Sequence, residues 1–449
     1  MGVIARQTII SSLGNYLGLI VGFVTTFFVL TDCLTPAEIG LTRILVDGAM
    51  LFSSLAMLGS SSSIVRFYPY FHSEDGDHGF FGWALLLPLV GYVLFAVCFF
   101  IFRPSIERVY SVHSELFVRY VYYLLPLTFF ALYMAVFESC SNVLMHIAVP
   151  KFVREVVVRV CNLVSYLLYG HGIVTFDVFV LLFCSSYALA AVVDFCYLLS
   201  LGRISFRLDM AFLDKGLVRQ ILGYTLLVTV VAVTTNVQLL NSIFLGAQQG
   251  LALAGVFTIA LYISNVVGVP SRSLIAIANP VISRSVKEQK HDELSMMVKK
   301  VSLHQLLITS MLYFFIVVNL SALYGVIPHG DEYVGGIGVV VILGLGNILQ
   351  QTVAPMNSVL NFSHRYVYSL PFSVLMSFTA IVLNLCLIPN FGTMGAALAT
   401  LGAIVVYNAV TTIFVATQLK VHPFSMAQLK ILGVIALLFV INLMWQLLL

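Results

Sequence analysis

The chain has 449 residues, of which 60% are hydrophobic and 9% are charged, and its mean hydropathy is +1.04. A soluble domain carries about 25% charged residues, so this composition excludes a soluble globular fold and predicts an all-α integral membrane protein. The net charge of +3 provides no basic patch for a nucleic acid, and the seven cysteines form no CxxC pair, so we expect no metal site, disulfide framework or cofactor.

Apolar runs of about 20 residues, the length that spans a bilayer, follow one another along the whole chain. The first run begins soon after Arg6 and is of full length, without the short apolar core and cleavage site of a signal peptide, so we interpret it as the first spanning helix. We predict thirteen spans, within a range of twelve to fourteen, at residues 8–31, 41–66, 81–102, 117–146, 151–170, 174–201, 217–245, 251–284, 299–325, 333–360, 366–388, 394–417 and 427–448.

Lysine and arginine are concentrated in alternate connections between these spans. Such residues are enriched in cytoplasmic loops. With the N-terminus in the cytoplasm, all of the 22 basic residues except Arg43, Arg103, Arg108 and Arg119 lie on or toward the inner side. The sequence therefore predicts a cytoplasmic N-terminus.

The spans fall into two similar groups. A charged cytoplasmic linker at 202–216 separates six spans in residues 1–201 from six more in residues 217–418, and residues 419–449 add one extra helix. We predict two six-helix lobes that are related by a pseudo-two-fold axis along the membrane normal.

A weak internal repeat supports this division. The first and seventh helices each open with an Arg-Gln pair, at residues 6–7 and 219–220, and each is followed by a turn and a glycine, Gly40 or Gly255.

A carboxylate lies within the fourth span, although a charge at the bilayer centre costs about 2.5–3.5 kcal/mol. Glu138, Asn142 and His146 are spaced four residues apart and form one helical stripe. Counted from the turn between the fourth and fifth spans, Arg159 lies at the depth of Glu138, and Asp194 on the sixth span reaches the same layer. This predicts a buried cluster with two open interpretations: an ion pair between packed helices, or a proton-coupling site.

Helical spacing offers two further ion pairs. Glu155 lies four residues before Arg159 and competes for it, and Arg43 and Asp47 are expected to form a local pair near the outer surface.

The second predicted lobe carries amides where the first carries charges. An amide offers both hydrogen-bond donors and acceptors, so amides that line a wet cavity suit sugar hydroxyls. The other interpretation is hydrogen bonding between helices. The candidates for contact with a glycan are Asn236, Asn241, Asn265, Asn347, Gln350 and Gln351.

The eighth span contains Arg272 between Pro270 and Pro280. The prolines can break the helix and turn the arginine toward a cavity, where a guanidinium is a suitable ligand for phosphate oxygens. The alternative is that Arg272 extends to the inner lipid headgroups.

Three stretches resemble the Wzx-type flippases of lipid-linked oligosaccharides, which belong to the superfamily of multidrug, oligosaccharidyl-lipid and polysaccharide exporters. They are "GSSSSIVRFYPYF" (59–71), "FESCSNVLMHIAVPKFVREVVVRV" (137–160) and "NFGTMGAALAT" (390–400). The resemblance implies a V-shaped pair of lobes with alternating access. It also implies the bacterial inner membrane, an undecaprenyl-diphosphate-linked glycan as substrate, and Arg66, Arg159 and Arg272 as its diphosphate ligands.

The resemblance further implies contact with membrane lipids, a monomer, and cooperation with polysaccharide polymerase or assembly proteins. Two relatives remain as alternatives. Cation-coupled drug exporters typically carry a carboxylate in the first helix, where this chain has Asn15, and the lipid II flippase usually has fourteen helices. A third alternative, a membrane glycan polymerase or ligase, is expected to need a sizeable outer loop, and the predicted outer loops are short. We therefore expect a transporter that is not an enzyme.

Overall fold

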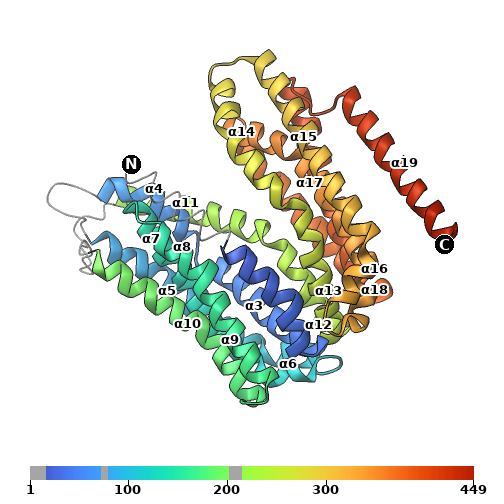
Figure 1. The fold of residues 1–449 in the computed structure, drawn as a ribbon. Helices are drawn as coiled ribbons and strands as arrows, with labels where there is room; N and C mark the ends of the chain where they lie inside the picture. The colour runs from blue at the N-terminus through green and yellow to red at the C-terminus, as the bar shows by residue number, and fades with distance from the viewer. Residues whose placement is uncertain (1–16, 72–78, 202–214, 449) are drawn as a thin grey trace. The chain divides into compact units, whose positions relative to one another are not determined.

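The computed structural model describes residues 17–71, 79–201 and 215–448, and every regular element in these ranges is a helix (Figure 1). The predicted all-α fold is confirmed. Two compact units, Met1–Gly255 and Val256–Leu449, divide the chain. With η for a 3-10 or π turn, the elements of the first unit are η1 (Thr25–Val29), α2 (Leu30–Cys33), α3 (Pro36–Ala56), α4 (Ser60–Phe71), α5 (Phe80–Tyr110), α6 (Glu115–Tyr120), η2 (Val121–Tyr123), α7 (Leu124–Val143), α8 (Ala148–Phe152), η3 (Val153–Val157), α9 (Val158–Gly170), α10 (Phe176–Ser200), α11 (Lys215–Thr235), η4 (Val237–Leu239) and α12 (Leu240–Gln248).

The next helix, α13 (Leu251–Asn265), begins in the first unit and continues into the second. In the second unit α17 lies at the centre and packs against α14, α15 and α18. The elements after α13 are η5 (Val266–Gly268), α14 (Val269–Lys287), α15 (His291–Val318), α16 (Leu320–Val326), η6 (Gly330–Gly336), α17 (Ile337–Phe362), η7 (Tyr366–Tyr368), α18 (Ser369–Gln418) and α19 (Met426–Leu448).

Each of the thirteen predicted spans lies largely on helix within the described ranges, the first from Leu17 onward. Among the described residues, eight helices, some formed by consecutive elements, are long and apolar enough to cross a membrane. The predicted eleventh and twelfth spans are joined in α18, which breaks at Gly392 (φ 54°, ψ −127°). Glycine adopts this backbone conformation without steric cost. Gly392 lies after the eleventh predicted span, which ends at residue 388, and before the twelfth, which begins at residue 394, so the break in α18 separates the two spans.

The helices also carry apolar side chains on their outer faces. Along α5, the exposed fractions of Val93, Leu94, Val97, Phe100 and Ile101 all exceed 50%. Such a surface is a liability in water, whereas in a bilayer it meets hydrocarbon chains while each helix satisfies its own backbone. The chain is therefore a multi-pass integral membrane protein.

The first unit is built around α7, which packs against α3, α4, α5 and α10. Near one end, Phe137 of α7 enters a buried aromatic cluster with Phe67 and Phe80. The unit also includes α11 and α12, because the hydroxyls of Ser63 and Thr225 lie 3.0 Å apart and α12 packs on α3.

The first compact unit thus extends through the predicted seventh span. The predicted linker 202–216 ends in α11, and its residues 202–214 lie outside the described ranges, as do the Arg-Gln pair at 6–7 and the start of the first span. The division into two six-helix lobes stays a prediction.

Two glycines that the sequence repeat places in equivalent positions lie against each other in the first unit. A methyl group on Gly40 would collide with the carbonyl of Leu251, and one on Gly255 would collide with the carbonyl of Pro36. The two contacts are reciprocal, since each glycine faces the carbonyl four residues before the other. Small residues let membrane helices approach this closely, so the crossing of α3 and α13 depends on both glycines.

We predict that Gly40→Ala destabilises the purified protein by about 1–3 kcal/mol, because the methyl group must push backbone away from backbone. The matched control is Gly325→Ala on α16, where a methyl group meets no atom within 4 Å. That change should be neutral or stabilising, since alanine is favoured over glycine in a helix by about 1 kcal/mol. Thermal unfolding in detergent measures both, and equal shifts for the two variants would contradict the close crossing.

Candidate functional site

The hairpin between the predicted fourth and fifth spans brings charged side chains together. α7 ends at Val143 and α8 begins at Ala148, with Met145 in a left-handed conformation (φ 62°) between them. Across this turn, Arg154 Nη1 lies 2.6 Å from Glu138 Oε2.

The predicted pairing of Glu138 with Arg159 is therefore wrong. That prediction placed the end of the fourth span at residue 146 and the start of the fifth span at residue 151. In the structure α7 ends at Val143 and α8 begins at Ala148, so the middle of the hairpin lies near residue 146. Glu138 precedes this centre by eight residues and Arg154 follows it by eight, so these two side chains meet.

Arg159 instead pairs with Glu155, as the competing i, i+4 spacing allows, with Nη2 and Oε2 2.9 Å apart. Its other terminal nitrogen donates to the carbonyl of Gly18 on the first helix. Gly22 leaves room for the guanidinium, since a methyl group there would collide with it. Arg159 therefore joins the first and fifth helices.

A π turn occurs in both of these helices, at η1 and at η3. π turns appear mostly as single turns within α-helices, frequently at functional sites. Glu155 belongs to η3, and a methyl group on Gly18 would come within 2.6 Å of its carbonyl oxygen. The irregular turn of the fifth helix therefore lies directly against the first helix.

Asp194 on α10 completes the cluster around Arg154. Its side chain is 1% exposed, and its Oδ1 has no hydrogen-bond partner among the described residues. Glu138 and Arg154 are the charged groups that act on it electrostatically. Asp194 is therefore linked electrostatically to Glu138, but the arginine beside Glu138 is Arg154, and neither Glu138 nor Arg154 is fully buried.

His146 lies in the turn after α7, so it does not extend the helical stripe of Glu138 and Asn142. Its Nδ1 lies 3.2 Å from the hydroxyl of Tyr197 on α10. A proton-coupling role for Glu138, Asp194 and His146 stays a prediction, as does a purely structural ion pair.

Arg66 lies on α4, the second half of an interrupted helix. The predicted second span breaks between α3 and α4 at Gly59 (φ 66°). Arg66 is exposed, and its guanidinium carbon lies 4.2 Å from the ring centroid of Tyr224 on α11. Among the described residues it has no carboxylate partner.

In the second unit, amides satisfy the backbone where the eighth span is interrupted by η5. Asn347 Nδ2 donates to the carbonyl of Ser264 at 3.0 Å, and Gln305 Nε2 donates to the carbonyl of Ser271 at 3.1 Å. Gln351 lies beside Gly268 of η5, because a methyl group there would come within 3.2 Å of its Nε2. The alternative interpretation, hydrogen bonding between helices, therefore describes Asn347 in this structure.

The other candidate amides are dispersed. Asn236 donates to the carbonyl of Ala232 on its own helix at 3.0 Å, Asn241 is buried, Asn265 is exposed and Gln350 is half-buried. A role in glycan contact stays a prediction for all of them.

Arg272 is exposed on the first turns of α14, just after Pro270 and the interruption at η5. In the part of the chain that the structure describes, its side chain has no ion pair or hydrogen bond. The interruption precedes Pro270, whereas α14 continues through Pro280. Whether Arg272 faces a cavity or the inner lipid headgroups stays a prediction.

Sequence reasoning missed several partners. The predicted pair of Arg43 and Asp47 is confirmed, with Nε and Oδ2 2.7 Å apart. The sequence did not show that Asp47 is only 3% exposed, or that it accepts a hydrogen bond from the hydroxyl of Ser242 at 2.5 Å. Arg154 and Gln305 were also missed, although both are polar residues within predicted spans.

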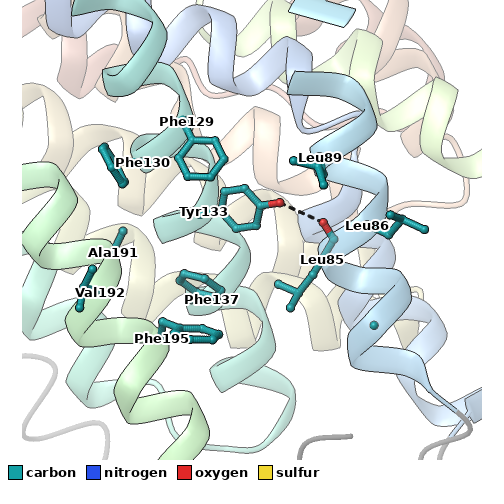
Figure 2. A pocket seen from close by; sticks show the side chains of 11 residues that line it. Leu85, Leu86, Leu89, Phe129, Phe130, Tyr133, Phe137, Ala191, Val192 and Phe195 are labelled. Carbon is teal, nitrogen blue, oxygen red and sulfur yellow. Dashed lines mark hydrogen bonds between the residues drawn. The ribbon is translucent and has the colours of Figure 1, made fainter. Parts of the chain in front are cut away.

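A cavity of about 440 Å³ lies between α5, α7 and α10 of the first unit (Figure 2). Aromatic side chains of α7 form its floor. The sequence signal for it is Phe129, Tyr133 and Phe137, which recur every four residues within one span.

Solved structures share this arrangement of helices. The inward closed lipid II flippase MurJ matches with a TM-score of 0.73 and 13% identity, covering 98% of this chain and 93% of that one. An inward-facing multidrug resistance MATE transporter of the MOP superfamily matches with a TM-score of 0.63 and 16% identity, covering 92% of this chain and 94% of that one. A MOP superfamily transporter from Pyrococcus furiosus matches with a TM-score of 0.60 and 15% identity, covering 93% of this chain and 95% of that one. The chain therefore has the fold of MOP superfamily transporters.

The chain belongs to the family described as polysaccharide biosynthesis protein, which matches residues 4–286. The resemblance drawn from the three sequence motifs is thus confirmed for the family and for the superfamily fold. The solved structures that share this fold are described as a flippase and as transporters, not as enzymes. A search of the curated proteins finds no match.

The observed pairing predicts a specific energetic coupling. In a double-mutant cycle, Glu138→Gln and Arg154→Gln should be coupled by about 0.5 kcal/mol or more in the free energy of unfolding, because the two side chains are in contact. Arg159 is unsuitable as a control, because its partner Glu155 also lies 3.6 Å from Arg154. Glu138→Gln combined with Arg103→Gln, whose partner is Glu107, serves as the control and should be additive within about 0.5 kcal/mol. Reversible unfolding of the purified protein measures both cycles, and an equal or larger coupling to Arg103 would contradict the pairing seen here.

Proposed function

We propose that the protein flips an undecaprenyl-diphosphate-linked oligosaccharide from the inner to the outer leaflet of the bacterial inner membrane by alternating access. The repeat unit of an O-antigen, a capsule or an exopolysaccharide is the substrate class. Membership in the polysaccharide biosynthesis family over residues 4–286 is the observation that carries the proposal. A cytoplasmic N-terminus and a monomeric state belong to the same proposal.

The distribution of arginines supports an anionic substrate. Arg159 is already bound to Glu155 and to the first helix, so a diphosphate would have to displace these contacts. Arg66 and Arg272 are exposed and have no carboxylate partner among the described residues. A guanidinium binds phosphate oxygens through two parallel hydrogen bonds, and neither arginine has to break an ion pair with a described residue to do so.

The interrupted helices support alternating access. The second span breaks at Gly59, the seventh contains η4 and the eighth contains η5. Discontinuous helices are typical of transporters in which one bundle moves against another around a fixed site. Such breaks allow part of a helix to reorient while the rest keeps its packing.

Deletion of the gene in a strain without a paralogue tests the proposal. We expect surface glycan to disappear and undecaprenyl-linked repeat units to accumulate on the inner leaflet. Normal surface glycan in that strain would contradict the proposal. Efflux of organic cations driven by a pH gradient, in vesicles that contain only this protein, would instead favour the cation-coupled exporter.

Arg272→Gln should reduce export of the lipid-linked glycan by about tenfold or more, since a hydrogen bond to a charged group contributes about 1.5–3 kcal/mol. The control is Arg284→Gln on the same helix, whose side chain is already paired with Glu288 at 2.7 Å. Both variants should accumulate in the membrane to the wild-type level. Surface glycan per molecule of protein measures the effect, and equal export by the two variants would exclude Arg272 as a diphosphate ligand.

A further inference from the structure

The cavity of the first unit is a groove with three sides. α7 forms the floor, and α5 and α10, which both pack on α7, form the walls. The rings of Phe129, Tyr133 and Phe137 follow one another along the floor, with centroids 4.7 and 5.6 Å apart, and Phe195 of α10 continues the series 5.4 Å beyond Phe137. Figure 2 shows these rings facing the aliphatic side chains of α5.

The groove offers hydrocarbon contact and no polar partner. Its single hydroxyl, on Tyr133, already donates to the carbonyl of Leu85 at 3.2 Å (Figure 2). The walls open outward, because Leu89 is 39% exposed and Val192 is 54% exposed. All three helices are candidate spans, and the volume of the groove falls within the about 300–1,000 Å³ typical of ligand sites. The chemistry of the lining selects an apolar chain.

One end of the groove lies at the depth of the charged cluster. Phe137 is the chain neighbour of Glu138, which pairs with Arg154, and Phe195 is the chain neighbour of Asp194, on which both of these charges act electrostatically. From Phe137 the floor runs for two helical turns to Phe129, about 12 Å at 1.5 Å per residue. The groove therefore extends from the polar layer of the unit into its apolar layer, as the tail of a lipid extends from its headgroup.

We propose that this groove holds the first isoprene units of the polyprenyl tail of the substrate. The inference rests on the proposed function and adds a binding site for the tail to it. A polyprenyl chain carries a methyl branch on every unit, and the rings of the floor, which contact one another in series, offer a continuous aromatic surface for these branches to pack on. An unbranched acyl chain has no such groups. Rigid aromatic rings also bind a chain at a low cost in conformational entropy.

Native mass spectrometry of the full-length protein in detergent tests the site. The probes are undecaprenyl phosphate and dioleoyl phosphatidic acid, which share a phosphate but differ in the branching of the tail. Leu86→Trp and Val192→Trp each fill the groove from a different wall. Leu94→Trp places the same side chain on the exposed surface of α5 outside the groove and serves as the matched control.

We expect the wild type and Leu94→Trp to retain undecaprenyl phosphate in preference to phosphatidic acid. In both groove variants, the affinity for undecaprenyl phosphate should fall by about tenfold or more. A variant is taken as folded when its elution in size-exclusion chromatography and its thermal unfolding match those of the wild type. One folded groove variant is enough to test the inference. The inference fails if the folded groove variants bind like the wild type, or if the wild type shows no preference between the lipids. Its failure leaves the gene-deletion test unaffected, because surface glycan is measured without reference to the groove.

Discussion

The membrane core contains no water to pair with a free carbonyl or N–H group, and this constraint governs how the helices of this protein are interrupted. The eighth span breaks at η5, where the following Pro270 also lacks a backbone donor. Asn347 from α17 and Gln305 from α15 donate to carbonyls on either side of the break. A break inside the membrane is tolerated when side chains restore the lost hydrogen bonds. The amides of the second unit thus allow a helix to be discontinuous while it remains packed.

The charged residues of the first unit follow a related constraint. Asp194 is almost fully buried, and a buried carboxylate is costly unless a cation accompanies it. Arg154 acts on Asp194 electrostatically while it pairs with Glu138 and with Glu155. The pairing of Arg154 with Glu138 depends on the turn between α7 and α8. The charge balance of the cluster is tied to the geometry of a single hairpin.

The sequence predicted the spans because their length and hydrophobicity are set by the bilayer. It also predicted that Glu138 and Asp194 lie together, since both distances were counted along regular helix. The sequence did not predict that Arg154 is the partner of Glu138, because the end of α7 at Val143 and the left-handed conformation of Met145 leave no signal in the composition. Partners on distant helices, such as Ser242 for Asp47, were equally inaccessible, because they depend on how helices cross.

Several arginines pair with a carboxylate on their own helix, which sets them apart from Arg66 and Arg272. Arg43, Arg103, Arg159 and Arg284 each bind a carboxylate on the same helix at i, i±4, so each is neutralised before any other helix packs against it. Such local pairs lower the cost of a charge near the membrane. Arg66 and Arg272, by contrast, have no carboxylate partner among the residues that the structure describes. Under the proposed function, a diphosphate headgroup would supply the opposite charge in the form that a guanidinium binds most specifically.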